Sequence, residues 1–246
     1  MERRVILGVP VDPVTYGETL DRIAAFVSGD RLHQICTVNP EFVMKAQDDP
    51  AFMAILNQAD LCIPDGVGLL WAARRLGTPL PERVAGSDLT WLIAERAAAE
   101  GWRLFLLGAR EGVAARCAEI LSARYPGLQV VGTYPGSPRH EENAAIVGRV
   151  NAARPDILLV AYGAPAQDKW IARNRDALPT VRMAMGIGGA FDFVTGEAKR
   201  APRWVQRLGL EWLDRLLREP WRWRRQLALP RFVWTVLQSR TNNQKE

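Results

Sequence analysis

The sequence predicts an α/β protein with a Rossmann-like, mainly parallel sheet flanked by helices, followed by a C-terminal amphipathic helical appendage. Short apolar and β-branched runs alternate with longer runs of helical periodicity, which is the pattern of βαβ units. The chain has 246 residues, enough for one large α/β domain with a buried core. Composition changes near residue 197, so we expect a Rossmann-like core over residues 1–196 and an appendage over residues 197–246.

Seven strands and seven helices are expected in the core, and they alternate except where two helices follow the third strand. The strand candidates are Arg4–Val9, Gln34–Thr37, Leu61–Pro64, Arg103–Leu107, Gln129–Gly132, Ile157–Ala161 and Arg182–Met185. The helix candidates are Thr15–Ser28, Pro40–Gln47, Gly66–Leu76, Ser87–Glu100, Gly112–Tyr125, Glu141–Ala153 and Pro165–Arg175. Asn39 is placed to cap the second helix ahead of Pro40, and Ser87-Asp88 offers a second cap.

The last fifth of the chain is basic and rich in tryptophan. From Lys199 to Glu246 there are 12 basic and 4 acidic side chains, a net charge of +8, whereas the preceding 198 residues hold 20 basic and 23 acidic side chains. Apolar side chains between Val205 and Arg218 fall on one helical arc, and Pro220 and then Pro230 are expected to break the helical course. Tryptophan beside arginine is typical of helices that lie at a membrane surface.

Several classes of protein are not favoured by the sequence. No apolar run reaches the ~18–20 residues that cross a bilayer, and the N-terminal residues lack a signal-peptide pattern. The cysteines, Cys36, Cys62 and Cys117, are far apart and show no CxxC spacing, and there are only two histidines. We therefore expect a cytoplasmic protein with reduced thiols and without a metal centre.

Polar residues that directly follow predicted strands are the first candidates for a binding site, because ligands of open parallel sheets bind beyond the carboxyl ends of the strands. Thr37 ends one predicted strand and Asn39 follows it, and Asn39 can cap a helix and face a pocket at once. Asp65 follows another strand and precedes Gly66. The dipeptide alone favours a turn aspartate, while a general base is the functional alternative.

Two glycine-containing turns are candidates for contact with a nucleotide. Gly163 and a proline-opened helix follow one strand, and free N–H groups at a helix start suit an anionic ligand. Residues 186–192 are dense in glycine, which lets the backbone approach a ligand closely. The segment is neither G-x-G-x-x-G nor a Walker motif, so a nicotinamide dinucleotide is not favoured.

The sequence has no Asp-x-Asp pair to hold a divalent ion on a diphosphate. A departing diphosphate would then have to be neutralised by basic side chains. Appendage arginines are spaced 3, 4 and 3 residues apart and would share one helical face if the helix continued through Pro220: Arg215, Arg218, Arg222 and Arg225. A solvated charged face is the alternative interpretation, which the interleaved tryptophans make less favourable.

The chain resembles the teichoic-acid N-acetylmannosaminyltransferase family, which is glycosyltransferase family 26 and includes enzymes of enterobacterial common antigen and capsular polysaccharides. The resemblance runs from about Val5 to about Phe232. It is carried by blocks that are individually weak and together specific: Thr37–Glu41, Pro64–Gly66, Pro81–Gly86, Gly163–Trp170, Gly186–Asp192 and Leu208–Pro220.

The resemblance implies an inverting, metal-independent transferase without a cofactor. It implies that Asp65 is the catalytic base, with Thr37 and Asn39 beside it, and that Gln167 lines the pocket. It also implies that Arg215, Arg222 and Arg225 reach the diphosphate when the appendage folds over the site. The matching blocks provide further substrate-binding candidates: Arg83, Gly163, Gly186, Gly188, Gly189 and Asp192.

The implied reaction moves N-acetylmannosamine from UDP-N-acetylmannosamine to undecaprenyl-diphosphate-linked N-acetylglucosamine, in teichoic-acid linkage-unit or related polysaccharide synthesis. Ala166 and Asp168 depart from the family pattern, so UDP-N-acetylmannosaminuronic acid or another UDP-hexose remains an alternative donor. More remote alternatives are an oxidoreductase and a nucleotide-binding membrane adaptor. Expected partners are the two substrates and the anionic inner face of the cell membrane, with peripheral attachment; a homo-oligomer is compatible with the sequence, and nucleic acid is not expected.

Overall fold

The computed structural model describes residues 2–199, 201–202, 205, 211–218, 220 and 223–243, without the side chains of residues 215, 224 and 240–243. Its strands are β1 (Arg4–Ile6), β2 (Val9–Val11), β3 (His33–Val38), β4 (Leu61–Pro64), β5 (Arg103–Gly108), β6 (Gln129–Tyr134), β7 (Ile157–Ala161) and β8 (Met183–Gly186). The helices of the first half are α1 (Tyr16–Val27), α2 (Pro40–Asp48), α3 (Pro50–Gln58), α4 (Val67–Arg75) and α5 (Gly86–Glu100). They are followed by α6 (Val113–Arg124), α7 (Asn143–Ala153), α8 (Ala166–Arg173), a 3₁₀ turn (Arg175–Ala177), α9 (Ala190–Thr195), α11 (Glu211–Arg218), α12 (Trp223–Gln226) and α13 (Ala228–Asn243).

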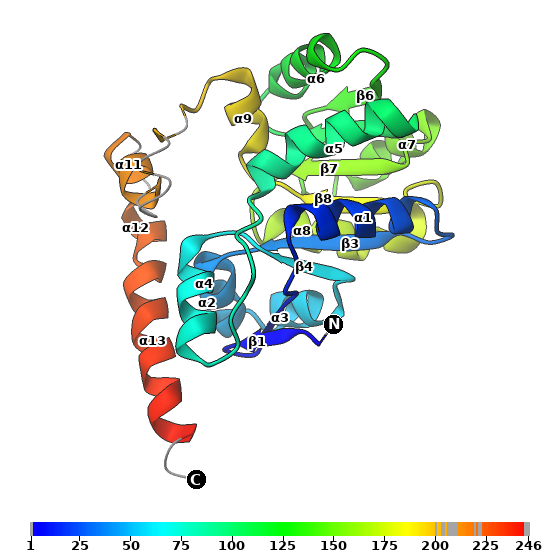
Figure 1. Cartoon of the computed structure of the whole chain (residues 1–246). Helices are drawn as coiled ribbons and strands as arrows, with labels where there is room; N and C mark the ends of the chain where they lie inside the picture. The colour runs from blue at the N-terminus through cyan, green and yellow to red at the C-terminus, as the bar shows by residue number, and fades with distance from the viewer. Residues whose placement is uncertain are drawn as a thin grey trace.

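A six-stranded sheet in the order β4-β3-β8-β7-β5-β6 forms the centre of the molecule (Figure 1). All five neighbouring pairs are parallel, which confirms the predicted Rossmann-like fold class. From β3 the chain moves outward to β4, and then crosses to the other side of the sheet to build β5 and β6. The last two strands, β7 and β8, fill the space between these halves, so β3 and β8 are neighbours in the sheet.

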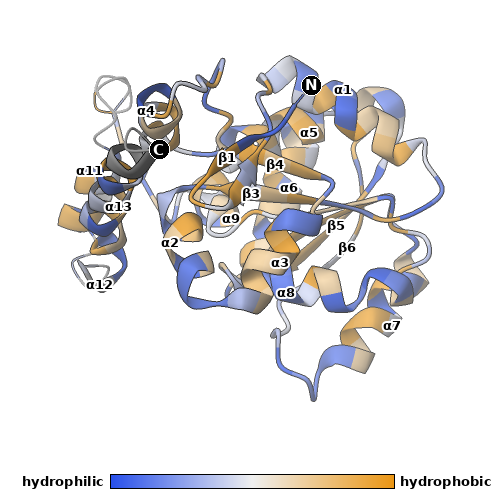
Figure 2. Ribbon diagram, turned by 90° about the horizontal axis from the view of Figure 1, so that it is seen from below, coloured by the Kyte–Doolittle hydropathy of each residue, from blue (hydrophilic) through white to orange (hydrophobic). Residues whose placement is uncertain are grey.

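Side chains that alternate along the strands form the two faces of the sheet. On one face, Ile35, Ile63 and Leu106 belong to the apolar cluster that contains residues of α1, α5, α6 and α9. On the other, Cys36 and Val38 pack with α2, α3 and α4, while Phe105, Leu158 and Val160 pack with α7 and α8. Figure 2 shows the apolar strands between helices whose outer sides are more hydrophilic. Because helices cover both faces of the sheet, the sequences of its buried strands are continuous apolar runs.

Four local predictions need correction. The single strand predicted over Arg4–Val9 is an antiparallel β1–β2 hairpin, because the chain turns at Leu7-Gly8 with positive φ at both residues. Helix α3 was not predicted; Asp49 caps it and Pro50 is its first residue. Ser87 does not cap α5, which begins at Gly86. Pro230 lies in the first turn of α13 and does not break it, since no N–H is needed there.

The C-terminal helices are joined to the core by packing and charge. Helix α13 runs as a long column beside α2 and α4 (Figure 1). Phe232 and Val236 on this helix are buried in the same apolar cluster as α2 and α4. Arg231 adds a bidentate ion pair with Asp48, at 2.5 and 2.8 Å. Within the described residues, none of the helices combines the length and apolar character required to cross a membrane.

Candidate active site

A cavity of about 700 Å³ opens at the carboxyl edge of the sheet. Residues that follow four neighbouring strands line it: Asn39 after β3, Asp65 after β4, Gly163 after β7 and Gly188 after β8. These strands lie on both sides of the β3–β8 boundary. The chain after β3 forms α2 on one face of the sheet and the chain after β8 forms α9 on the other, and such a divergence leaves a crevice at the carboxyl edge of a parallel sheet. Residues of α11, α12 and α13 line the cavity on another side, so both the core and the appendage form this pocket.

Asp65 presents its carboxyl group to the cavity from the end of β4. Burial raises its pKa from 3.8 to about 6, although the charge of Arg83 and the Gly86 N–H oppose the shift. That N–H donates to Asp65 Oδ2 at 3.3 Å. A carboxylate of this pKa is ionised at neutral pH and accepts a proton more readily than an ordinary aspartate. The arrangement therefore suits the general-base alternative rather than the simple turn aspartate.

Arg83 lines the cavity from the loop that precedes α5. The loop is fixed by backbone contacts with two neighbouring elements: Val84 N–H donates to the Pro64 carbonyl at 2.9 Å, and Ala85 N–H donates to the Tyr16 hydroxyl at 2.8 Å. The guanidinium forms an ion pair with Glu211 of α11. Arg83 is therefore located beside Asp65 by the core, while its ion-pair partner comes from the appendage.

Thr37 and Asn39 both line the cavity, as the sequence predicted. The Thr37 hydroxyl donates to the Gly186 carbonyl at 3.1 Å, which ties the end of β3 to the end of β8. Asn39 Oδ1 accepts from the Phe42 N–H at 3.0 Å and so caps α2. Asn39 therefore caps α2 and lines the pocket at the same time, as predicted, because a helix that follows a strand begins at the edge of the sheet where ligands bind.

Gln167 holds together the two glycine-containing turns. Its side chain is buried, and Oε1 accepts from both the Gly163 N–H and the Gly188 N–H at 3.0 Å. Gly186 leaves the space that this side chain occupies, since a Cβ there would come within 2.5 Å of Gln167 Nε2. Gln167, Gly163, Gly188 and Gly189 line the cavity, whereas Gly186 supports it from behind.

Asp192 lies outside the cavity lining. It is in the first turn of α9, where Oδ1 lies 3.6 Å from the Arg110 guanidinium. Arg110 also pairs with Glu197, so Asp192 belongs to a charged group at the end of α9. The structure therefore does not place this predicted binding residue with the others.

Among the predicted appendage arginines whose side chains the structure describes, Arg225 lines the cavity. Its Nε and Nη2 donate to the two Glu41 carboxylate oxygens at 2.9 and 3.0 Å. Burial favours a raised pKa for Glu41, but its pairs with Arg225 and Lys45 hold the pKa below the ordinary value. Arg222 and the side chain of Arg215 lie outside the described residues, so their predicted roles stay predictions.

The cavity also contains residues that sequence reasoning missed. Lys199, Glu211 and Trp212 line it together with apolar side chains of α9 and α13: Phe193, Phe232 and Val233. No role in the site was predicted for Glu211. No local pattern could have shown that this carboxylate meets an arginine 128 residues earlier in the chain.

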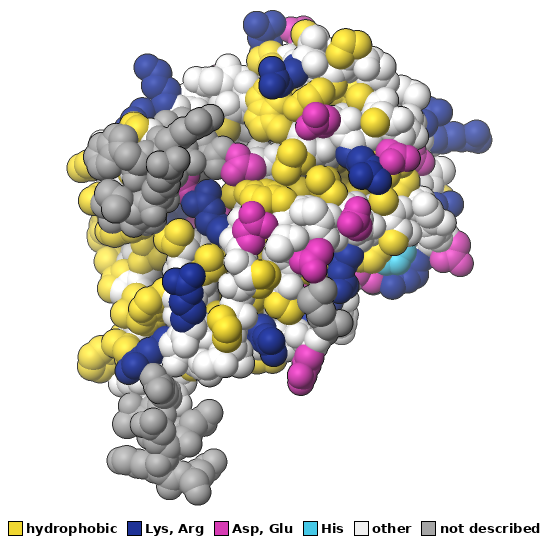
Figure 3. All heavy atoms as spheres, viewed as in Figure 1, with side chains coloured by type: hydrophobic (Ala, Val, Ile, Leu, Met, Phe, Trp, Pro, Cys, Tyr) yellow, Lys and Arg dark blue, Asp and Glu magenta, His cyan; other side chains and the backbone are white. Residues whose placement is uncertain are grey.

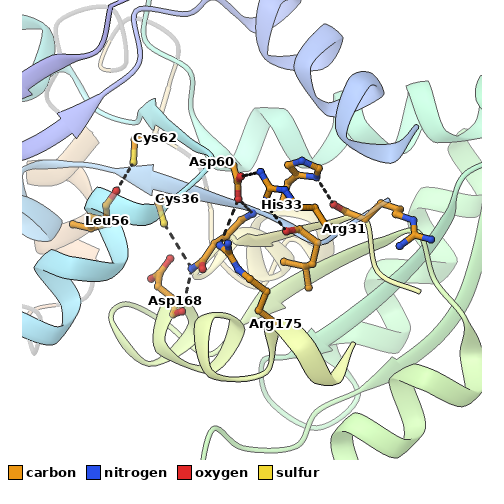
Figure 4. Close-up of polar contacts among 12 residues, drawn as sticks. Arg31, His33, Cys36, Leu56, Asp60, Cys62, Asp168 and Arg175 are labelled. Atoms are coloured by element: carbon orange, nitrogen blue, oxygen red, sulfur yellow. Dashed lines mark hydrogen bonds and ion pairs between the residues drawn. The ribbon is translucent and has the colours of Figure 1, made fainter. Parts of the chain in front are cut away.

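A buried acid lies behind this site, one residue beyond Gln167. The carboxyl of Asp168 lies beside the Cys36 thiol, and its backbone carbonyl accepts from Gln34 Nε2 at 3.0 Å (Figure 4). Neither carboxyl oxygen receives a well-formed hydrogen bond from a described residue, and a thiol is only a weak donor. Burial raises the pKa of Asp168 to about 7.

Comparison with known proteins gives the family of this chain. The model of the glycosyl transferase WecG/TagA/CpsF family matches residues 4–246. The chain is 37% identical over 203 residues to an N-acetylglucosaminyldiphosphoundecaprenol N-acetyl-beta-D-mannosaminyltransferase of Bacillus spizizenii, covering 82% of this chain and 78% of the relative. It is 35% identical over 208 residues to the protein of the same name from Bacillus subtilis, covering 85% and 80%. The chain is therefore a member of the WecG/TagA/CpsF family of glycosyl transferases.

Proposed function

We propose that this protein transfers N-acetylmannosamine from UDP-N-acetylmannosamine to undecaprenyl-diphosphate-linked N-acetylglucosamine, with inversion and without a metal ion, in the synthesis of a teichoic-acid linkage unit or a related polysaccharide. The observation that carries the proposal is the cavity at the carboxyl edge of the sheet with Asp65 in its wall. The names of the two Bacillus relatives support the choice of sugar and acceptor.

In the proposed reaction Asp65 acts as the general base. Its carboxylate takes the proton of the acceptor hydroxyl, the hydroxyl oxygen bonds to the anomeric carbon, and the bond from that carbon to the UDP oxygen breaks with its electron pair going to UDP. Attack from the face opposite UDP inverts the configuration. A pKa of about 6 leaves Asp65 ionised at neutral pH and still basic enough to assist the attack.

The negative charge on the departing diphosphate needs basic partners. Arg83, Lys199 and Arg225 line the same cavity. Two of them come from the loop before α5 and from α12, so charge is supplied by both the core and the appendage. Preorganised cations in a cavity of limited water content stabilise a leaving diphosphate in the way that a metal ion does elsewhere.

The appendage of residues 197–246 is proposed to attach the enzyme peripherally to the cytoplasmic face of the membrane, where its acceptor lies. Large apolar side chains in and between α11, α12 and α13 are exposed: Trp212, Leu217, Trp223, Leu227 and Trp234. Hydrophobic atoms gather along the side of the molecule formed by these helices (Figure 3). Exposed tryptophan together with the net charge of +8 over residues 199–246 favours binding to anionic lipids.

The proposal is tested by a donor screen with a soluble lipid-diphosphate-linked N-acetylglucosamine, measuring UDP release and the mass of the product. UDP-N-acetylmannosamine should give a product longer by one N-acetylhexosamine, and D65N should not. Transfer from UDP-N-acetylmannosaminuronic acid in its place would support the alternative donor. UDP release that does not depend on the lipid-linked acceptor would contradict the proposed acceptor.

A further inference from the structure

The ion pair between Arg83 and Glu211 joins the core to the appendage inside the cavity. Arg83 lies in the loop before α5, and Glu211 is the first residue of α11. The two side chains are 19% and 30% exposed, so the pair is largely removed from water. An ion pair in such a place has a larger electrostatic effect on its neighbours than a pair on the surface.

Asp65 is the neighbour that this ion pair affects. The guanidinium of Arg83 favours its ionised form, while the carboxylates of Glu211 on α11 and Asp88 on α5 disfavour it. Tyr16 of α1 donates to Asp88 and thereby joins the same group. The remaining charged side chains that line the cavity are Glu41, Lys199, Asp214 and Arg225.

The core fixes Arg83, but the appendage carries Glu211. When α11 is docked, Glu211 shares the charge of the guanidinium and adds its own negative charge to the surroundings of Asp65. Without the Glu211 carboxylate, the whole charge of Arg83 would act on Asp65, which would then be a weaker base. A side chain of the appendage thus affects the proton affinity of a carboxyl group in the core.

We propose that Glu211 is a positioning residue of the transferase, whose carboxylate pairs with Arg83 and turns its charge away from Asp65, so that Asp65 is most basic when the appendage covers the cavity. This inference rests on the proposed function, because it assigns to Asp65 the role of base. Beside membrane attachment and contact with the diphosphate, it gives the appendage a further role: covering the cavity makes Asp65 a stronger base. A cavity that is open to water would then hold a less reactive base.

The first test compares pH profiles of kcat/KM for the full-length enzyme between about pH 5 and about pH 9. In E211Q the acid limb should move to lower pH by roughly half a unit or more, because a negative charge is lost and Arg83 is released toward Asp65. In R83Q it should move to higher pH. The matched control is D48N, which removes the Asp48–Arg231 ion pair. This pair joins the core to α13 outside the cavity, so the acid limb of D48N should coincide with that of the wild type.

The double variant R83Q/E211Q shows whether Glu211 acts through Arg83. E211Q should shift the acid limb of the kcat/KM profile less in the R83Q background than in the wild-type background. An equal shift in both backgrounds, or an acid limb in E211Q that coincides with the wild type, overturns the inference. A shift of D48N equal to that of E211Q also overturns it, since the effect would then come from loosening of the appendage in general.

A second measurement covers the case in which E211Q has too little activity for a profile. The side-chain carboxyl of Asp65 can be titrated by NMR in protein labelled with ¹³C-aspartate, with D65N identifying the signal. The pKa of Asp65 should be lower in E211Q than in the wild type and unchanged in E211D. An unchanged pKa in E211Q overturns the inference whatever the activity. If the pKa of Asp65 is lower in E211Q than in the wild type but the wild-type protein transfers no sugar, the proposed function fails and the effect of Glu211 on Asp65 stands.

Discussion

Replacement of Asp65 by asparagine should lower activity and raise stability at the same time. The amide keeps the shape of the side chain, but it cannot accept the proton of the acceptor hydroxyl. We expect kcat to fall by roughly 10²–10⁴, the usual contribution of a general base, with UDP binding close to normal. The kcat/KM of the wild type should decrease at pH values below about 6, because Asp65 is protonated there.

The stability effect follows from the shift of the pKa from 3.8 to about 6. The folded state binds this proton more tightly than the unfolded state does. The stability that the protonated carboxyl contributes is therefore complete below the unfolded pKa and is lost as the pH rises through the folded pKa. A shift of about two units corresponds to about 3 kcal/mol at most, and less in practice because Asp65 is partly exposed to the cavity.

Asparagine does not titrate, so D65N should be more stable than the wild type at about pH 8 and similar to it at about pH 4. For a chain of this size, each 1 kcal/mol changes Tm by roughly 2–4 °C. Thermal unfolding of both proteins at the two pH values measures the difference. A loss of stability in D65N that is equal at both pH values, or a loss of activity of only a few-fold, would refute the assignment of Asp65 as a buried base.

Other substitutions and conditions test further parts of the site. Turnover should survive EDTA largely unchanged, and a strict need for added Mg²⁺ or Mn²⁺ would contradict neutralisation by basic side chains. R225A should depress transfer strongly but reduce vesicle binding only slightly, since one surface charge contributes about 1 kcal/mol; a parallel loss of both in flotation and transfer assays would make Arg225 a membrane contact only. G186A should lower transfer because its Cβ would displace Gln167, and an unchanged rate would show that Gln167 is not needed in its place. D168N should raise Tm at about pH 8 more than at about pH 5, because the pKa of the buried acid is raised to about 7 and stability is lost as pH rises toward it; equal Tm changes would contradict this.

Local patterns were sufficient for most of the fold and for the central site residue. Apolar runs of strand length alternating with helical periodicity predicted the parallel sheet, because strands covered on both faces leave no polar alternation. Asn39 was recognisable as a cap from Pro40 beside it, and Asp65 as a candidate from its place directly after a strand. These features depend on residues within a few positions of one another, and the edge at which parallel strands end is set by the fold class alone.

The remaining features of the site depend on contacts between segments that are distant in the sequence. Helix α5 begins at Gly86, ahead of the predicted Ser87 cap, and there the Gly86 N–H donates to Asp65, a carboxyl 21 residues earlier. The raised pKa of Asp65 follows from its burial in the cavity wall, which no neighbour in sequence reveals. Glu211 meets Arg83 only because α11 lies over the cavity. Periodicity and capping are short-range properties of the chain, whereas the electrostatic environment of a buried group is a sum over everything that packing brings within a few ångströms of it.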